Sequence, residues 1–378
     1  MKKIPFNKPS LVGSELSYIS DAISRGQLSG DGHYTKKCNA LIETLTGAGK
    51  ALLTHSCTAA LEMAAILADL QPGDEVILPS FTFVSTANAV ALRGAVPVFV
   101  DIDPETLNID PAAAAAAITP RTKAIIAVHY AGVPAEMDAL GELCDRHGLM
   151  LIEDAAQAMG STYNGRPCGS LGALAAFSFH ETKNIISGEG GALTINDPDL
   201  VVRAEIIREK GTNRSRFLRG QVDKYTWVDI GSSFLPGELV AAFLCGQLEQ
   251  IETVNAHRLA TFDLYNEAFS DLADSGRVRR PVVPGHCHAN GHMFYLLLRD
   301  IDDRDAFIAQ MREDGIATPF HYVPLHSSPA GKNLARAAGS MAVTDDISAR
   351  LVRLPVYYGV MDETDRVINA TRQYLERN

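Results

Sequence analysis

The feature that most constrains the fold is a series of short apolar runs, separated by helix-forming stretches, in the first two thirds of the chain. Near-continuous apolar runs of this length are typical of strands buried on both faces, and strands that alternate with helices indicate a parallel sheet. We therefore predict an α/β fold with a mixed, mostly parallel sheet flanked by helices. The expected strands are Ala51–Thr54, Val76–Pro79, Val96–Val100, Ala124–His129, Leu149–Glu153, Leu174–Phe179 and Ala192–Ile195.

The expected helices lie between these runs. Asp110 and Pro111 precede six alanines, which places an N-cap residue and a first-turn proline before the best helix former. Ala59–Leu70, Ala135–His147 and Pro198–Lys210 are the other helical stretches that we expect here.

The pattern changes near residue 250, where a long helix and a Pro/Gly-rich stretch replace the alternation. We predict a large domain over residues 1–250 and a smaller α+β domain over residues 251–378. The expected elements of the smaller domain are a helix over Ile251–Leu272, a strand over Met293–Leu298, a helix over Arg304–Asp314 and a loop over Thr318–Pro329.

Charge and composition exclude several classes of protein. The formal net charge is −11, so the surface as a whole is a poor match for nucleic acid. No stretch approaches the roughly 18 apolar residues that span a bilayer, and no signal peptide is visible at Met1–Phe6. The six cysteines form no CxxC pair. We expect a cytoplasmic protein with reduced thiols.

Two residues that could carry chemistry follow predicted strands. In open α/β sheets, ligands bind beyond the carboxyl ends of the strands. Asp154 lies at such an end, although it could equally cap a following helix. Lys183 follows the strand that ends at Phe179 and precedes Gly188–Gly191. Burial would favour its neutral, nucleophilic amine, whereas a solvated loop lysine is the simpler interpretation if the residue is taken alone.

Two further features are weak alone. Ser56, Cys57 and Thr58 form a turn of small residues before a helix; such a turn offers free N–H groups to a phosphate, but also suits a plain helix cap. Phe81 and Phe83 follow a strand, where an aromatic ring could stack on a heterocycle or simply pack in the core.

Together these groups fit one ligand, pyridoxal phosphate. This cofactor needs an amine for its aldehyde, an anion for its ring nitrogen, a cradle for its phosphate and a face for its ring. The carboxylate keeps the ring nitrogen protonated, so that the ring acts as an electron sink. All four kinds of group are expected at strand ends on the same side of the sheet.

The same residues carry a resemblance over essentially the whole chain. The sequence resembles the sugar aminotransferases of the DegT/DnrJ/EryC1/StrS family, which have the fold of type I pyridoxal-phosphate enzymes. A longer segment, Glu205–Ser233, resembles one subgroup, the transaminases that form dTDP-4-amino-4,6-dideoxy-D-galactose. The motifs that carry the family resemblance are Ser56–Leu61, Pro79–Asn88, Val128–Val133, Glu153–Gln157, Phe177–Asn184 and Gly188–Gly191.

The resemblance implies a role for each matching residue. Lys183 is expected to hold the cofactor as a Schiff base and to shuttle the proton, and Asp154 to pair with the ring nitrogen. Relatives usually add an asparagine from the second subunit to the phosphate site of a homodimer; here Gly231–Leu235 lacks it, which leaves Ser232 or Ser233 as substitutes. The remaining expected cofactor contacts are Cys57, Thr58, Phe83, Gln157 and Ser178.

Residues 203–224 combine seven Lys/Arg with three acidic residues, a local charge of +4. A diphosphate-linked substrate would be drawn to such a segment, although a solvated loop without a ligand is the alternative. We expect substrate contacts from Lys210, Arg214, Arg219, Lys224 and Tyr322.

The predicted reaction moves the amino group of L-glutamate to C4 of dTDP-4-dehydro-6-deoxy-D-glucose. Action on a 3-keto or differently configured nucleotide sugar is the main alternative. A sugar dehydratase would carry histidine at Lys183, and a retired, non-catalytic scaffold would have lost Lys183, Asp154 or Ser178. We predict no metal site, because the His/Cys residues at 286–292 lack an ordered ligand spacing.

Overall fold

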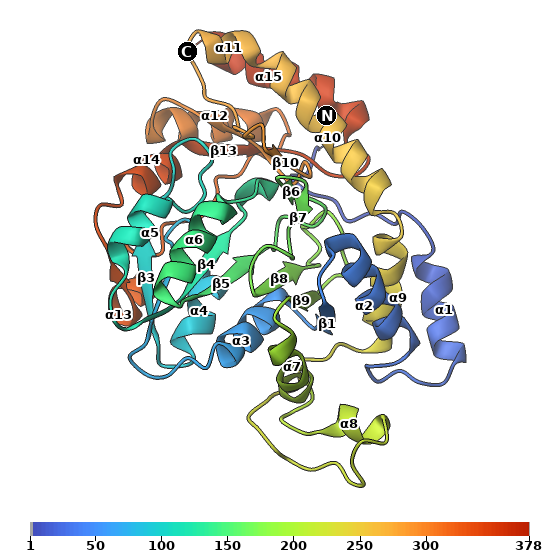
Figure 1. Ribbon diagram of the computed structural model, residues 1–378. Coiled ribbons are helices and arrows are strands. Elements are labelled where there is room, and N and C mark those ends of the chain that lie inside the picture. The colour runs from blue at the N-terminus through green and yellow to red at the C-terminus, as the bar shows by residue number, and fades with distance from the viewer. Residues whose placement is uncertain (1–2, 378) are drawn as a thin grey trace.

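The computed structural model describes residues 3–377. Its centre is a twisted sheet of eight strands in the order β1-β9-β8-β5-β4-β2-β3-β12 (Figure 1). β9 runs antiparallel to both of its neighbours, and the other pairs are parallel. The strands are β1 (Lys50–Thr54), β2 (Glu75–Pro79), β3 (Val96–Val100), β4 (Thr122–Val128), β5 (Met150–Asp154), β8 (Leu174–Ser178), β9 (Gly191–Ile195) and β12 (Arg336–Ala337).

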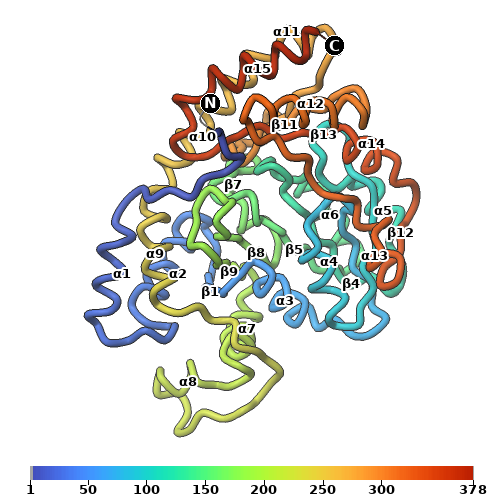
Figure 2. Tube along the Cα trace, turned by 180° about the vertical axis from the view of Figure 1, so that it is seen from behind, coloured from blue at the N-terminus to red at the C-terminus, as the bar shows by residue number. Residues whose placement is uncertain are grey.

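Helices cover both faces of this sheet (Figures 1 and 2). The alternation within β4 shows why: Ala124 and Ile126 pack into one core, and Ile125 and Ala127 into another. One face is covered by α3 (Cys57–Leu67), α4 (Val84–Ala91) and α7 (Val201–Arg208). The opposite face is covered by α2 (His33–Thr46), α5 (Pro111–Ala117), α6 (Met137–His147) and α9 (Glu238–Leu248).

The predicted fold class is confirmed, and each expected strand of the first two thirds is present. Pro198–Lys210 is not one helix, because Pro198–Leu200 forms a single 3-10 turn before α7. Helices α1 (Glu15–Ser24), α2, α4 and α9 were not predicted. A further short helix, α8 (Arg214–Leu218), lies in a loop that projects from the lower end of the body in Figure 1.

The chain after residue 250 builds a separate core around an antiparallel pair, β11 (Phe294–Leu297) and β13 (Leu351–Leu354). The expected long helix is broken into α10 (Ile251–Ala268) and α11 (Ser270–Asp274). The division near residue 250 stays a prediction, since β12 of this part pairs with β3 of the main sheet. The other helices here are α12 (Ile301–Glu313), α13 (Pro329–Leu334), α14 (Ala342–Arg350) and α15 (Thr364–Arg377).

Small pairings complete the fold. β10 (Cys287–His288) pairs with β6 (Thr162–Tyr163), which also pairs with β7 (Arg166–Pro167). Over the described residues, none of the helices combines the length and the apolar character that crossing a membrane requires.

Candidate active site

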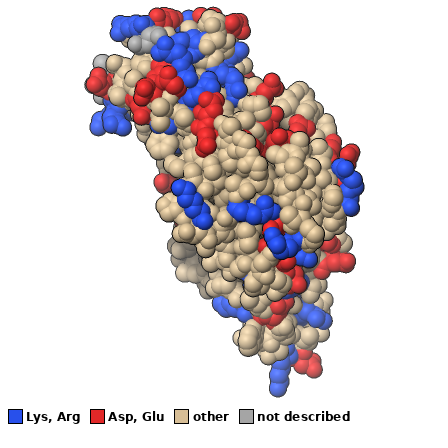
Figure 3. Space-filling view, turned by 90° about the vertical axis from the view of Figure 1, so that its left-hand side faces the viewer, with Lys and Arg blue, Asp and Glu red and all other residues tan. Residues whose placement is uncertain are grey.

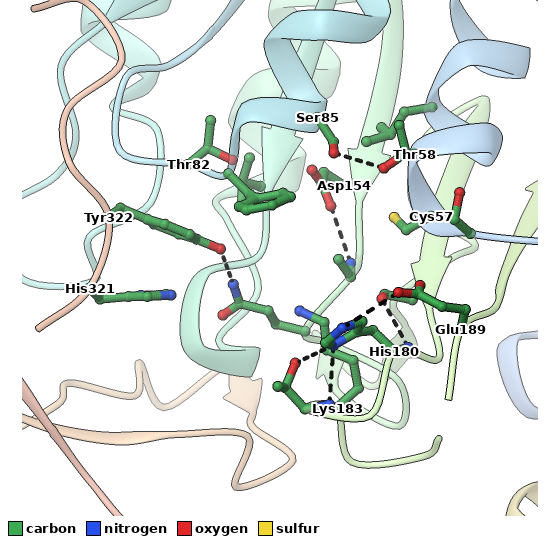
Figure 4. Close-up of a pocket in the computed structure, with 18 of the residues that line it drawn as sticks. Cys57, Thr58, Thr82, Ser85, Asp154, His180, Lys183, Glu189, His321 and Tyr322 are labelled. Carbon is green, nitrogen blue, oxygen red and sulfur yellow. Dashed lines mark hydrogen bonds and ion pairs between the residues drawn. The ribbon is translucent and has the colours of Figure 1, made fainter. Parts of the chain in front are cut away.

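A cavity of about 550 Å³ lies where β5 and β8 end and α3 begins. This large cavity gathers residues that are far apart in sequence, because parallel strands end at the same edge of the sheet. Figure 4 shows Asp154 pointing toward its middle, with Cys57 and Thr58 on one side and His321 and Tyr322 on the other. Eight of the predicted site residues line it: Cys57, Thr58, Phe83, Asp154, Gln157, Ser178, Lys183 and Tyr322.

Asp154 ends β5 and is almost fully buried. Its Oδ2 accepts a hydrogen bond of 2.8 Å from the Thr86 hydroxyl of α4. Burial raises the pKa of this carboxyl, and the bond from Thr86 partly opposes the shift. No helix follows Asp154, so the helix-cap interpretation is wrong. A buried carboxylate with one side-chain donor is suited to an additional cationic partner from a ligand.

Lys183 follows β8 through a tight turn in which its backbone N–H donates to the carbonyl of His180 over 2.9 Å. Its side chain faces the large cavity. Burial lowers the pKa of the Lys183 amine, while Cys57 and Asp154 act in the opposite direction. A larger neutral fraction makes this amine a better nucleophile toward an aldehyde than a solvated lysine would be.

The start of α3 supplies the anion-binding end of the cavity. The Ser56 hydroxyl caps the helix by accepting from the amide of Ala59 over 3.0 Å. The amides of Cys57 and Thr58 belong to the first turn, where helical N–H groups have no intrahelical acceptor and suit a phosphate. Gly191 permits this turn to lie against β9, because a Cβ there would stand 2.5 Å from the amide nitrogen of Cys57.

Aromatic residues close another side of the cavity. Phe83 is 56% exposed and borders it, whereas Phe81 is fully buried in the core, so the two rings of the motif have different environments. Gln157 donates to the Tyr322 hydroxyl over 2.9 Å. The His321 ring stacks on Tyr322 with centroids 3.6 Å apart. These contacts fix the orientation of Gln157 and Tyr322 at the cavity.

The other predicted site residues do not line this cavity. They belong to the segment between α7 and α9, which includes the projecting loop with α8. Arg219 pairs with Glu205 at 2.7 Å and Arg214 with Glu209 at 3.3 Å. At the lower end of the face drawn in Figure 3, positive and negative side chains lie side by side. The residues absent from the cavity lining are Lys210, Arg214, Arg219, Lys224 and Ser232.

The structure adds lining residues that the sequence analysis missed. Ser85 accepts from or donates to Thr58 over 2.7 Å; it lies, like Thr86, inside the Pro79–Asn88 motif, which was the available signal. Arg353 comes from β13. Its signal was a single cation within the apolar run Leu351–Val356. His180, Glu189 and His321 also line the cavity.

One buried cluster has the residue types of a metal site. His129, Glu153 and Cys168 place their ligand atoms within 4.8 Å of one another. Both oxygens of Glu153 are already engaged, by His129 and by the backbone amides of residues 169, 171 and 172. The cluster therefore braces the loop after β7, and the expectation of no metal site stays a prediction.

The fold and the cavity together define a type I pyridoxal-phosphate enzyme. The residues fit the cofactor on four points: an amine of lowered pKa, a buried carboxylate, free first-turn amides and an exposed aromatic face. A model of the DegT/DnrJ/EryC1/StrS aminotransferase family matches residues 9–372. The chain belongs to this family and is a pyridoxal-phosphate-dependent aminotransferase.

Three similar proteins illustrate the relationship. Protein MJ1066 of Methanocaldococcus jannaschii, described as uncharacterized, is 32% identical over 99% of this chain and 98% of its own. The aminotransferase TlmJ of Streptoalloteichus hindustanus is 30% identical, with a TM-score of 0.91 over 100% of both chains. The pyridoxal-phosphate form of the sugar aminotransferase Spr1654 of Streptococcus pneumoniae, itself called putative, is 25% identical, with a TM-score of 0.91 over 100% and 99%.

Proposed function

We propose that the enzyme transfers the amino group of L-glutamate to C4 of dTDP-4-dehydro-6-deoxy-D-glucose. The products are dTDP-4-amino-4,6-dideoxy-D-galactose and 2-oxoglutarate. The observation that supports the transfer chemistry is the meeting of Lys183, Asp154 and the α3 turn in one cavity. The choice of sugar rests on the resemblance of Glu205–Ser233 to one subgroup. We further propose that the reaction takes place in the cytoplasm.

Each cavity residue has a proposed part. Bound pyridoxal phosphate supplies an electron sink for the bond changes at the amino carbon. Lys183 would hold the cofactor by binding the aldehyde of pyridoxal phosphate, and the Nζ of Lys183 would move a proton. Asp154 keeps the ring nitrogen protonated, and Gln157 faces the ring hydroxyl. Phe83 stacks on the ring. The amides of Cys57 and Thr58, with the hydroxyl of Ser178, hold the phosphate.

The stereochemistry of the product follows from the position of one amine. Lys183 comes from a single turn after β8 and can deliver a proton to only one face of the sugar. If the sugar binds as the subgroup resemblance implies, the new C4 amine is axial and the product has the galacto configuration. Tyr322 lines the cavity and is a proposed contact of the sugar.

We also propose that the enzyme is a homodimer with shared active sites. The projecting loop with α8 exposes large apolar side chains, among them Trp227, which is 79% exposed. Contiguous exposed apolar residues of this kind mark interaction sites. In a dimer this loop would bring Ser232 and the basic residues Lys210, Arg214, Arg219 and Lys224 to a neighbouring cavity. Sedimentation that showed a fully active monomer would contradict this arrangement.

The function is tested with purified protein, pyridoxal phosphate, L-glutamate and the 4-keto sugar nucleotide, followed by NMR of the product. The expected product carries an axial C4 amine, and borohydride is expected to fix the cofactor to Lys183. Lys183→Ala should abolish turnover, because the covalent link and the proton shuttle are lost together. An equatorial amine would exclude the proposed sugar product while leaving the aminotransferase class intact.

A 3-keto sugar nucleotide serves as the matched control substrate. Faster amination of that sugar than of the 4-keto sugar would replace the proposed substrate by the alternative. A protein that remains colourless with added pyridoxal phosphate, and that is not labelled at Lys183, would contradict the proposed role of this residue.

A further inference from the structure

A second, smaller cavity of about 210 Å³ adjoins the large one at Lys183. This small cavity lies away from the α3 turn, since neither Cys57 nor Thr58 lines it. The two cavities therefore form one cleft with Lys183 at the junction. The residues that line both are Gln157, Thr182, Lys183, His321, Tyr322 and Arg353.

The small cavity is lined by cations and by no acid among the described residues. Its permanently charged side chains are Arg258 and Arg353, and the Lys183 amine, whose pKa burial lowers, lies at the junction. Two guanidinium groups around a space of this size leave a local excess of positive charge. Buried charges are normally paired, and an unpaired one is unfavourable until a partner arrives.

Arg353 shows this lack of a partner most directly. Its Nη2 donates to the carbonyl of Phe320 over 2.9 Å, and its guanidinium lies 4.3 Å from the centre of the Phe6 ring. Its Nε is buried and makes no hydrogen bond. No ion pair of the described residues includes this guanidinium. Burial lowers the pKa of Arg353, as expected for a cation that is removed from water.

Arg258 provides a second, more rigid cation. It is buried, and its guanidinium is held by the carbonyls of Gly291 and His292 at 3.2 and 2.6 Å. Those acceptors are neutral, so its charge is also not compensated by an acid. Burial lowers the pKa of Arg258 to about 9.

We propose that the small cavity binds a carboxylate of the amino donor, with Arg353 as the residue that recognises it. The planar fork of arginine matches the two oxygens of a carboxylate. A bound donor would thus lie beside the Lys183 amine, on the side of the cleft away from the start of α3. A dicarboxylic amino acid such as glutamate suits a small cavity with two arginines. The inference rests on the proposed function, which supplies the donor.

The first test measures binding rather than turnover. Glutarate, which has both carboxylates of glutamate and no amine, is titrated calorimetrically into the holoenzyme and into its Arg353→Gln variant. We expect the variant to bind glutarate roughly tenfold to a hundredfold more weakly, as expected for the loss of charge-assisted hydrogen bonds. A thermal shift caused by glutarate should be present in the unaltered enzyme and absent from the variant.

Three controls isolate the guanidinium. Arg350→Gln changes a nearby arginine that pairs with Asp346 at 2.7 Å and lines neither cavity, so glutarate binding should stay unchanged. Uncharged glutaramide should bind the unaltered enzyme at least about tenfold more weakly than glutarate. This comparison of probes needs no variant, and it holds even if Arg353→Gln folds poorly. Arg353→Lys keeps the charge and loses the planar fork. Its affinity for glutarate should lie between that of the unaltered enzyme and that of Arg353→Gln.

Other sources of the anion give different results. If Arg353 instead meets the diphosphate of the sugar nucleotide, Arg353→Gln raises the KM for that substrate and leaves glutarate binding unchanged. If it meets the cofactor phosphate, the variant loses affinity for pyridoxal phosphate. Either result, or equal binding of glutarate and glutaramide, overturns the inference. Borohydride labelling of Lys183 and amino transfer by the same preparation show whether the proposed function stands independently.

Discussion

Two groups of arginines in this molecule differ in how their charge is compensated. In the segment 203–224, Arg203 pairs with Asp229 at 2.9 Å, and Arg219 and Arg214 pair with Glu205 and Glu209. In the cleft, Arg258 and Arg353 have no acidic partner among the described residues. The first group is conspicuous in the sequence as a basic stretch, and the second is not.

The comparison shows that pairing, rather than the local sum of charges, indicates where an anion is to be bound. An anion that approaches Arg219 must compete with a carboxylate that is already present. An anion that enters the small cavity meets charges that burial has left without a partner, and its binding relieves an unfavourable state. The following predictions test whether this distinction holds.

The largest expected effect concerns Asp154, the buried acid of the large cavity. Asp154→Asn keeps the shape of the side chain and removes the charge that would hold the proton on the cofactor ring. We expect kcat to fall by about a hundredfold to a thousandfold, the range for loss of one preorganised electrostatic group. The cofactor should still bind to Lys183, as borohydride labelling would show.

Thr86→Val is the matched control, because it removes the hydroxyl that bonds Asp154 and Thr82 and leaves the charge of Asp154. Its kcat should fall far less than that of Asp154→Asn. Turnover of the Asn variant within a fewfold of normal would exclude the proposed role of this carboxylate.

Much of the fold and of the cofactor site could be predicted from the sequence, for local reasons. The buried strands are continuous apolar runs, and Asp110 and Pro111 begin a helix as expected, with the Asp110 carboxylate accepting from the amide of Ala112 over 2.8 Å. Asp154 and Lys183 were predicted as site residues because parallel strands end at one edge, and the structure brings both to the large cavity.

The residues that sequence analysis missed depend on contacts between distant segments. Arg353 reaches the cleft only because β13 packs against β11 in a second core, a placement that no local pattern encodes. The pairing of Arg219 with Glu205, fourteen residues away, likewise depends on the path of the loop around α8. Helix α2 was missed because its buried residues include the polar Thr35 and Asn39, which interrupt the apolar pattern.

The next prediction concerns a fully paired acid. Glu75 is buried in β2 and binds Arg336 of β12 at 2.8 Å and Arg121 at 2.5 Å. The hydrogen bonds to Arg336, which has the larger effect, and to Arg121 lower the pKa of Glu75 from 4.5 to about 2. A depressed folded-state pKa stabilises the protein above pH 4.5, and the contribution is lost as the pH falls toward 2.

Glu75→Gln should therefore lower the free energy of unfolding at pH 7 by about 2 to 3 kcal/mol. Urea unfolding between pH 7 and pH 3 measures the difference from the unaltered protein. The difference should be constant above about pH 5 and should narrow below it. A difference that grew as the pH fell would show that another group is responsible.

A smaller effect is expected from replacing Arg214. This variant tests whether a loop arginine that already has an acidic partner can nevertheless bind an anion of the substrate. Among the described residues the one ion pair of Arg214, to Glu209, is long, at 3.3 Å, and its side chain is partly exposed, so Arg214 is more available to a ligand than Arg219. We expect Arg214→Gln to raise the KM for the sugar nucleotide about tenfold, with no change for glutamate. Lys224→Gln, the matched control, should act more weakly, since a point charge suits phosphate oxygens less well. Equal effects on both substrates would indicate an effect on folding or assembly.

The smallest expected effect concerns the ion pair between Arg219 and Glu205, which makes two contacts, at 3.1 and 2.7 Å. The Glu205 carboxylate raises the pKa of Arg219, but the guanidinium is 45% exposed, so water and salt screen the attraction. A double-mutant cycle of Arg219→Gln and Glu205→Gln should give a coupling of about 0.2 to 1 kcal/mol, as for other exposed pairs. The coupling should shrink further in high salt.

If Arg219 instead turns to the diphosphate when substrate is present, Glu205→Gln alone should lower the KM for the sugar nucleotide, because it removes the competing carboxylate. A coupling well above 1 kcal/mol, insensitive to salt, would show that the loop arginines are as shielded from water as those of the cleft and that exposure does not separate the two groups.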